Sequence, residues 1–253
     1  MLLNACEAGS ASAIQGGVDG DRLTGTAGDD VIRGFAGEDR IEGLEGRDDL
    51  DGGTNADRAF GGPGIDRMVG LGGQDRLYGG GEPDALSGQE GDDRLYAGGG
   101  GGVANGGPGE DEVVGGDGRD RLDGEADADG VLGGPGDDRL EGGEGGDLLE
   151  GQQGDDSLFG ELGRDVMLGG DGGDFIDAAD GMPGDEVDCG AGSGDIAQAE
   201  EGDSVTSCET TRVSGHRRSA AHAGNVRTKS CTLNPNRCEE TYDRDAVRAG
   251  SSA

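Results

Sequence analysis

Aromatic residues are scarce in this chain, which has no Trp, three Tyr and four Phe among 253 residues, whereas 60 residues are Gly. Because large apolar side chains supply most of the buried area of a globular core, this composition excludes an ordinary close-packed domain. Basic residues are also few: Asp and Glu outnumber Lys and Arg by 55 to 20, for a formal net charge of −35. Low hydrophobicity with high net charge is typical of disordered chains, so composition alone favours disorder as much as folding.

The lack of basic and apolar stretches also limits the partners and the location. Such acidity argues against binding to nucleic acid or to an anionic membrane, and it favours cations. No stretch approaches the roughly 18 apolar residues of a membrane span, so no transmembrane segment is predicted. The N-terminal sequence MLLNACEAGSASA lacks the charged and apolar regions of an intact signal peptide, and a start truncated upstream is one interpretation.

A nine-residue phrase repeats without insertion from Gly16 to Asp177, giving 18 copies in 162 residues. Its first position is Gly in 17 copies, with Ala97 the exception, and its sixth is Asp in 17, with Gly102 the exception. Position 4 is Gly in 14 copies, and position 8 is aliphatic throughout. Low-complexity drift does not keep three chemically different positions in phase for this length, so the repeat overrides the expectation of disorder.

Each nonad predicts half a coil. The stretch G-G-x-G-x-D suits a tight turn, and the remaining x-U-x, with U aliphatic, suits a short strand with one inward side chain. Nonads n and n+2 then stack about 4.8 Å apart, and the chain forms a parallel β-roll of about nine 18-residue coils. The position-8 side chains fill its interior, as two columns that include Leu122, Leu140 and Leu158 on one sheet and Val131, Leu149 and Met167 on the other.

The stacked turns bring the position-6 carboxylates into like-charged rows, such as Asp120, Asp138 and Asp156. Ordering nine residues costs about 10 kcal/mol or more, whereas one buried Leu returns about 2–3 kcal/mol, so the apolar column alone is insufficient. A hard cation between the carboxylates would reverse their repulsion. Ca²⁺ accepts six to eight oxygen ligands in irregular geometry, whereas Mg²⁺ demands an octahedron. The repeat contains no His or Cys for a transition metal.

With its motif G-G-x-G-x-D-x-U-x, segment 16–177 resembles the RTX, or haemolysin-type, calcium-binding nonapeptide repeats of secreted bacterial proteins. The resemblance covers about two thirds of the chain. It implies a right-handed β-solenoid, an extracellular location, and an ion between adjacent same-side turns that takes an Asp from each. Eighteen nonads contain 16 such gaps, of which 14 have Asp on both sides because Gly102 interrupts two. The resemblance therefore implies up to about 14–16 Ca²⁺ ions.

The implied metal ligands are the position-6 aspartates and the position-4 glycines, whose turns expose carbonyl groups. The aspartates are Asp21, Asp30, Asp39, Asp48, Asp57, Asp66, Asp75, Asp84, Asp93, Asp111, Asp120, Asp129, Asp138, Asp147, Asp156, Asp165 and Asp174. The glycines are Gly28, Gly37, Gly46, Gly64, Gly73, Gly91, Gly109, Gly118, Gly136, Gly145, Gly154, Gly163 and Gly172.

Beyond Asp177 the phase breaks, although an Asp-x-U rhythm persists at Asp185, Asp195 and Asp203. We expect a flexible segment at 1–15, the β-roll at 16–177, a capping coil at 178–209 and a disordered basic tail at 210–253. The 19-residue separation of Cys189 and Cys208 is about one coil, which permits a disulfide that closes the cap, and the alternative is a free pair of small buried residues. The VDCGAG sequence around Cys189 is similar to the C-terminal ends of many such repeat proteins.

Three further cysteines lie outside the repeat and the cap. Cys231 and Cys238 could close a small loop in the tail, and Cys6 is left as the odd thiol.

No catalytic motif is present, since H-E-x-x-H, G-x-S-x-G and the P-loop are all missing. Acid pairs such as Asp29-Asp30 recur with the repeat and are better explained as turn residues than as a glycosidase dyad. We therefore predict a non-catalytic secreted or surface protein that binds calcium. The alternative is the calcium module of a larger secreted enzyme or toxin, as the family often provides. Ice binding is disfavoured because the outward rows are not rich in Thr or Asn.

One outward face is distinctive. Position 7 of alternate nonads gives a row of arginines, Arg22, Arg40, Arg58, Arg76 and Arg94, and position 9 gives Phe60, Tyr78, Tyr96, Val114 and Leu132. These rows predict a face for a protein or surface partner or for self-association. The alternative is ordinary strand filling in which the arginines offset nearby carboxylates.

Overall fold

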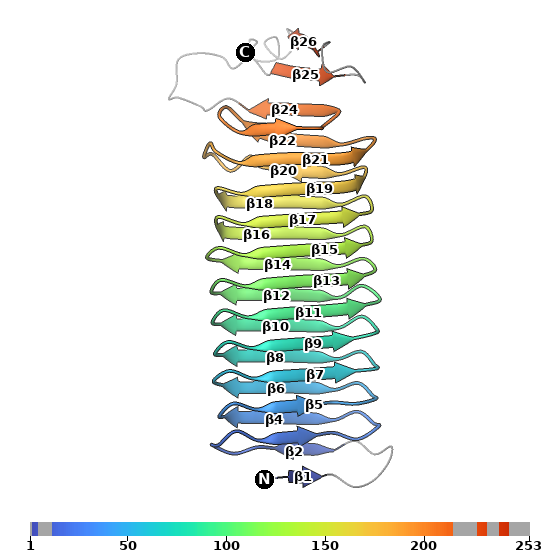
Figure 1. The fold of residues 1–253 in the computed structure, drawn as a ribbon, viewed down its shortest axis with the longest axis vertical. Helices are drawn as coiled ribbons and strands as arrows, with labels where there is room; N and C mark the ends of the chain where they lie inside the picture. The colour runs from blue at the N-terminus through green and yellow to red at the C-terminus, as the bar shows by residue number, and fades with distance from the viewer. Residues whose placement is uncertain (1, 5–11, 215–226, 232–237, 243–253) are drawn as a thin grey trace, which may run out of the picture.

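A computed structural model describes residues 2–4, 12–214, 227–231 and 238–242 of the chain. Every regular element in these ranges is a β-strand, and the strands stack along one long axis (Figure 1). The chain alternates between two sheets, so that consecutive strands lie on opposite sides and strands n and n+2 are hydrogen-bonded neighbours. The predicted parallel β-solenoid is therefore confirmed.

The first sheet has 12 strands and contains the odd-numbered elements up to β23. Its strands are β1 (Leu2–Asn4), β3 (Arg22–Thr24), β5 (Arg40–Glu42), β7 (Arg58–Gly62), β9 (Arg76–Gly80), β11 (Arg94–Gly99), β13 (Glu112–Asp117), β15 (Gly130–Pro135), β17 (Leu148–Gln153), β19 (Val166–Gly172), β21 (Glu186–Gly192) and β23 (Ser204–Thr206).

The second sheet has 14 strands and ends in two antiparallel ones. Its strands are β2 (Ala13–Gln15), β4 (Val31–Ala36), β6 (Asp49–Thr54), β8 (Arg67–Gly72), β10 (Ala85–Glu90), β12 (Val103–Pro108), β14 (Arg121–Ala126), β16 (Arg139–Gly145), β18 (Ser157–Gly163), β20 (Phe175–Asp177), β22 (Ile196–Glu200), β24 (Thr210–Ser214), β25 (Arg227–Cys231) and β26 (Cys238–Tyr242).

The core is the predicted pair of aliphatic columns. In the second sheet Leu122, Leu140 and Leu158 are register partners, 18 residues apart, and none is exposed to solvent. Leu149 and Met167 pair in the same way in the first sheet. Because each strand contributes one inward side chain between two outward ones, the core is only as wide as two facing columns.

The solenoid is longer than the nine coils predicted and has about 11 turns. At its beginning β2 pairs with β4, and both the amide and the hydroxyl of Ser12 donate to Asp30 Oδ1. At its end β21 to β24 continue the parallel ladder after the nonads stop. The pairing survives there because only turn lengths change: the register offset grows to 20 residues at Val166↔Glu186 and to 21 at Phe175↔Ile196.

The segment from residue 210 onward was predicted to be disordered, but Thr210–Ser214 forms β24 and pairs with β22. The strands β25 and β26 follow as an antiparallel pair in which Cys231 and Cys238 are opposite each other. The remainder of the segment, including both histidines, lies outside the described residues, as do Cys6 and the side chains that decide whether Cys231 and Cys238 are joined.

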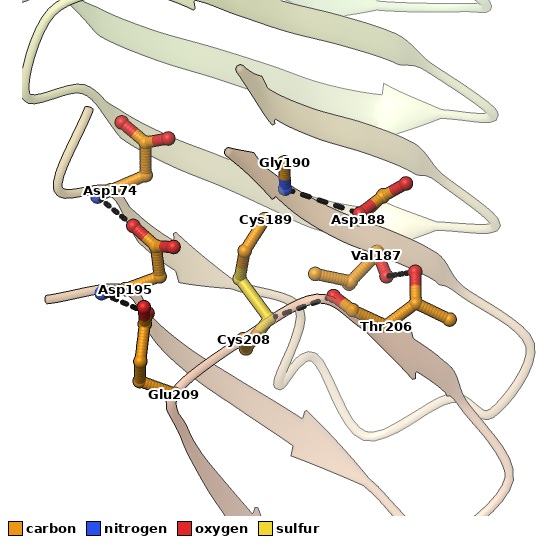
Figure 2. Close-up of a disulfide and its surroundings, with 9 residues drawn as sticks. All are labelled: Asp174, Val187, Asp188, Cys189, Gly190, Asp195, Thr206, Cys208 and Glu209. Carbon is orange, nitrogen blue, oxygen red and sulfur yellow. Dashed lines mark hydrogen bonds between the residues drawn. A yellow bond between two sulfur atoms is a disulfide. The ribbon is translucent and has the colours of Figure 1, made fainter. Parts of the chain in front are cut away.

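The predicted disulfide is present in the last coils. Cys189, in β21, is joined to Cys208, just after β23, with the two Cα atoms 5.1 Å apart (Figure 2). The Cys189 side chain is fully buried against the aliphatic core. The bond therefore ties the end of the core column to the closing turn, where the solenoid would otherwise expose apolar surface and unpaired strand edges.

Candidate metal-binding turns

The position-6 aspartates form two hydrogen-bonded rows, one along each edge of the solenoid. The backbone N–H of Asp120 donates to Asp138 Oδ1 at 2.8 Å, and that of Asp138 donates to Asp156 Oδ1 at 2.8 Å. On the other edge the N–H of Asp129 donates to Asp147 Oδ1, and that of Asp147 donates to Asp165 Oδ1. The predicted 18-residue partnership of these residues is confirmed, and adjacent nonads serve different rows.

We define the rows by the parity of their nonads. The even row is Asp30, Asp48, Asp66, Asp84, Asp120, Asp138, Asp156 and Asp174, and the odd row is Asp21, Asp39, Asp57, Asp75, Asp93, Asp111, Asp129, Asp147 and Asp165.

Only one oxygen of each carboxylate is used in this ladder. The other, Oδ2, is buried without a hydrogen-bond partner in 14 of the aspartates, although buried polar atoms in native proteins nearly always have a partner. These are Asp39, Asp48, Asp57, Asp66, Asp75, Asp84, Asp93, Asp111, Asp120, Asp129, Asp138, Asp147, Asp156 and Asp174. So regular a set of unpartnered oxygens calls for a ligand that is not a hydrogen-bond donor.

The position-1 glycines show what surrounds these oxygens. A Cβ added to Gly133 would lie 2.5 Å from Asp138 Oδ2 and 2.9 Å from the carbonyl oxygen of Gly151 in the next coil. Gly142 has the equivalent neighbours, Asp147 Oδ2 at 2.5 Å and the Gly160 carbonyl oxygen at 2.8 Å. Each turn thus brings a carboxylate oxygen and a carbonyl oxygen of the neighbouring coil over the bare Cα of a glycine.

The position-4 glycines let successive turns stack closely. The φ of Gly136 is 155°, and a Cβ there would collide with the carbonyl oxygen of Gly118. Where position 4 is not Gly, Asn55 and Asp127 still adopt the left-handed conformation, with φ of 83° and 78°. The structure therefore places the predicted position-4 residues in the stacked turns, beside the aspartate rows.

Burial sets the electrostatics of the rows. It raises the pKa of Asp129 to about 8 and that of Asp93 to about 7, and the neighbouring carboxylates of the same row add to the rise. The pKa of Asp138 rises to about 6 for the same reason. A row of buried carboxylates therefore resists ionisation on its own, and a cation close to the oxygens would stabilise the charged form.

The donor set fits a hard cation. Within the described residues no three His, Cys, Asp or Glu side chains converge on one point, so a metal ion here must also take backbone carbonyl oxygens. Carboxylate and carbonyl oxygens in mixed, irregular arrangements are the ligands that Ca²⁺ uses in proteins. The turns offer no nucleophile or acid–base pair outside this oxygen set, so their chemistry is cation binding.

Two predicted aspartates at the beginning of the even and odd rows differ from the others. Asp30 accepts from the Thr26 N–H through Oδ2, so its second oxygen already has a donor. Asp21 is only half-buried, and its Oδ2 accepts from the Gly17 N–H at 2.8 Å. The first gap of each row is therefore less like the rest.

The ladder also continues into the cap, through residues that were not predicted as site residues. The N–H of Asp165 donates to Asp185 Oδ1 and that of Asp174 to Asp195 Oδ1, both at 2.9 Å. The Asp195 N–H in turn donates to Glu209 (Figure 2). The Asp-x-U rhythm after Asp177 marked Asp185 and Asp195 in the sequence, but the irregular turn lengths hid their place in the rows.

Comparison with known proteins agrees with this geometry. The model of the RTX calcium-binding nonapeptide repeat, a unit of four copies, matches residues 15–50, 51–85, 70–103, 105–140 and 141–176, which is more than half of the chain. No curated protein matches the chain in sequence. No helix in the described ranges has the length and apolarity needed to cross a membrane. The nonad pattern, the β-solenoid and the family match together show that the chain belongs to the RTX calcium-binding nonapeptide repeat family.

Proposed function

We propose that this protein is a non-catalytic, secreted calcium-binding β-roll whose folding depends on extracellular calcium. The observation that carries the proposal is the set of 14 buried Asp oxygens without a hydrogen-bond donor. Leaving one buried polar atom unsatisfied costs about 1–3 kcal/mol, and more if it is charged. The folded chain is therefore expected to need a cation in these turns.

The proposed ligands of each ion are the aspartates of two same-side turns and the carbonyl groups of the surrounding glycines. For the gap between Asp120 and Asp138, the glycine carbonyls include those at positions 1 and 4 of the two turns, among them Gly118 and Gly136. Fourteen gaps have Asp on both sides, so about 14 ions are expected. Their positive charge would offset most of the formal net charge of −35.

Calcium binding and folding should then be one reaction. An unfolded chain does not hold the two turns together, so the ions bind the folded state and stabilise it by mass action. We expect affinities of about 10⁻⁴–10⁻³ M, as in other extracellular calcium modules. The cytosolic calcium concentration is far lower, so such sites would fill only after export.

A circular dichroism titration tests this proposal. The chain in EGTA should give little β signal, and added Ca²⁺ should produce it cooperatively, whereas Mg²⁺ at the same concentration should not. A spectrum that is the same with EGTA and with Ca²⁺ would refute the coupling.

The disulfide supports the proposed location. Disulfides such as Cys189–Cys208 persist in oxidising compartments and are rare in the cytosol. Protein recovered from the culture medium of a bacterium that exports the chain should contain the 189–208 bond when mapped by mass spectrometry without reduction. Recovery of the chain only from the cytosol, with both thiols free, would contradict secretion.

We propose, as a second and separate role, that the outward Arg and aromatic rows of the first sheet contact an acidic protein or surface partner. Phe60, Tyr78 and Tyr96 stack as a ladder, with ring centroids 4.9 Å apart and planes within 5°. In the neighbouring row Arg40 and Arg94 are paired with Glu42 and Glu112.

Two arginines of that row remain available for a partner. Arg58 and Arg76 are adjacent in register, and neither forms an ion pair within the described residues. Two like charges side by side on a sheet are unfavourable unless an anion approaches them.

The variant Tyr78→Lys with Tyr96→Lys should weaken binding to the surface or change the oligomeric state, as measured by pull-down and by analytical ultracentrifugation. The matched control is Phe159→Lys with Phe175→Lys, the outward aromatic pair of the second sheet. If both variants behave like the wild type, this role is ruled out.

A further inference from the structure

The two most important exceptions to the repeat fall in a single nonad. Among 18 nonads, position 1 departs from Gly only at Ala97, and position 6 departs from Asp only at Gly102. The two residues are five positions apart in the same turn. The structure explains why they occur together.

In a regular nonad, positions 1 and 6 compete for the same space. The position-6 carboxylate folds back over the position-1 Cα, so that a Cβ on Gly115 would lie 2.7 Å from Asp120 Oδ2, and one on Gly133 would lie 2.5 Å from Asp138 Oδ2. Real Cβ atoms do not approach other heavy atoms so closely. A side chain at position 1 and an Asp at position 6 therefore exclude each other.

The nonad that begins at Ala97 resolves this competition in the opposite way. The Ala97 methyl is buried, and it lies 3.0 Å from where a Cβ on Gly102 would be. The methyl thus occupies the space that a carboxylate fills elsewhere.

The backbone around the pair keeps its place in the solenoid. The Gly102 N–H donates to Asp120 Oδ1 at 2.5 Å, as the N–H of a position-6 Asp does. The φ of Gly102 lies outside the left-handed region, so its backbone does not itself require Gly. The exchange concerns side chains.

We infer that Ala97 and Gly102 are a compensating pair that closes the even row to calcium at this nonad. This inference rests on the proposed calcium function. The gaps on either side, Asp84/Gly102 and Gly102/Asp120, hold no ion, and the even row is divided into one ion series from Asp30 to Asp84 and another from Asp120 to Asp174. The odd row has Asp93 and Asp111 at this level and continues past the break.

The inference predicts how calcium sites can be restored. Gly102→Asp alone should add no ion and should lower the melting temperature, because the Ala97 methyl blocks the carboxylate. Ala97→Gly together with Gly102→Asp should add two ions. Ala97→Gly alone should add none. The number of ions per chain is measured by equilibrium dialysis followed by atomic emission, and stability by thermal denaturation in excess Ca²⁺.

A second pair of variants covers the case in which the turn backbone resists conversion, since Gly100 and Gly101 both have positive φ. In the first, residues 97–102 are replaced by the six residues Gly133–Asp138, GGPGDD. The matched control carries AGPGDG at the same place, which retains Ala at 97 and Gly at 102. The GGPGDD chain should bind two more ions than the AGPGDG chain.

The outcomes separate the two claims. If the wild type binds no calcium, the proposed function fails. If the wild type binds calcium but neither the double variant nor the GGPGDD chain gains ions, the inference is wrong. It is equally wrong if Gly102→Asp alone gains two ions, because Ala97 would then not be a block.

Discussion

The nonad coils and the capping coils share one ladder but close their turns by different means. In the nonad coils the turn begins with Gly, and the position-6 Asp keeps a buried oxygen without a donor. In the capping coils Asp185 and Asp195 accept the same N–H bonds, yet neither has a buried oxygen that lacks a partner. Cys189, whose carbonyl occupies the position-1 place above Gly169, forms a disulfide instead.

The difference shows that the backbone ladder does not by itself require an ion. The strands pair and the apolar column continues through Val187 and Ala197 in the cap, where turn lengths vary. What the regular nonads add is a bare Cα beneath a carboxylate and a neighbouring carbonyl. We infer that calcium holds the nonad coils and that a covalent bond holds the cap.

The largest expected effect concerns the nonad coils without calcium at different pH. Burial raises the pKa of their aspartates, for example that of Asp57 to about 7 and that of Asp129 to about 8, from an ordinary value of 3.8. The folded ion-free chain therefore holds protons more tightly than the unfolded chain, so this contribution is fully present below about pH 4 and is lost as the pH rises through 6–8. In EDTA the β signal in circular dichroism should be larger at pH 5 than at pH 8. An equal or smaller signal at pH 5 would contradict this.

The next effect compares the two core segments in saturating calcium. Leu140→Ala removes a fully buried side chain from the nonad column and should lower the free energy of unfolding by about 2–5 kcal/mol. Val187→Ala in the capping column removes a smaller side chain and should cost less. Denaturant midpoints measure both. A larger loss for Val187→Ala would mean that the cap, not the nonad region, limits stability.

Removing the disulfide should affect the cap alone. Cys208→Ala opens a link between residues 19 apart, which stabilises by about 3 kcal/mol in the chain-entropy account. Limited proteolysis should then cut within 186–206, while the nonad coils remain protected in calcium and the number of bound ions does not change. Cleavage spreading through the nonads would show that the two regions are not independent.

The smallest expected effect is on the number of ions. Asp138→Asn keeps an acceptor for the Asp120 N–H but weakens the two gaps that Asp138 flanks, so up to two ions should be lost. Asp185→Asn makes the matching change in the cap and should leave the number of ions unchanged. Equilibrium dialysis compares the two. Equal losses would mean that the cap binds calcium as the nonads do.

Much of this molecule could be predicted from its sequence because one period governs it. The two sheets, the 18-residue register and the inward column of Leu140 and Leu149 all follow from nine residues per half-coil, and they are confirmed. The coil number and the roles of Asp185 and Asp195 were missed, because turns of altered length break the phase without breaking the hydrogen-bonded ladder. The dependence of Gly102 on Ala97 is invisible in a list of exceptions, because it arises from a contact across the turn.

Hydrogen–deuterium exchange followed by mass spectrometry tests the central claim most directly, because it reads each region of the chain separately. In saturating Ca²⁺ the amides of residues 34–177 should be protected, and in EDTA at pH 8 they should exchange as in an unfolded chain, with protection returning when Ca²⁺ is restored. Protection of the nonad amides that is the same in EDTA and in Ca²⁺ would show that the β-roll stands without ions, and it would contradict the account.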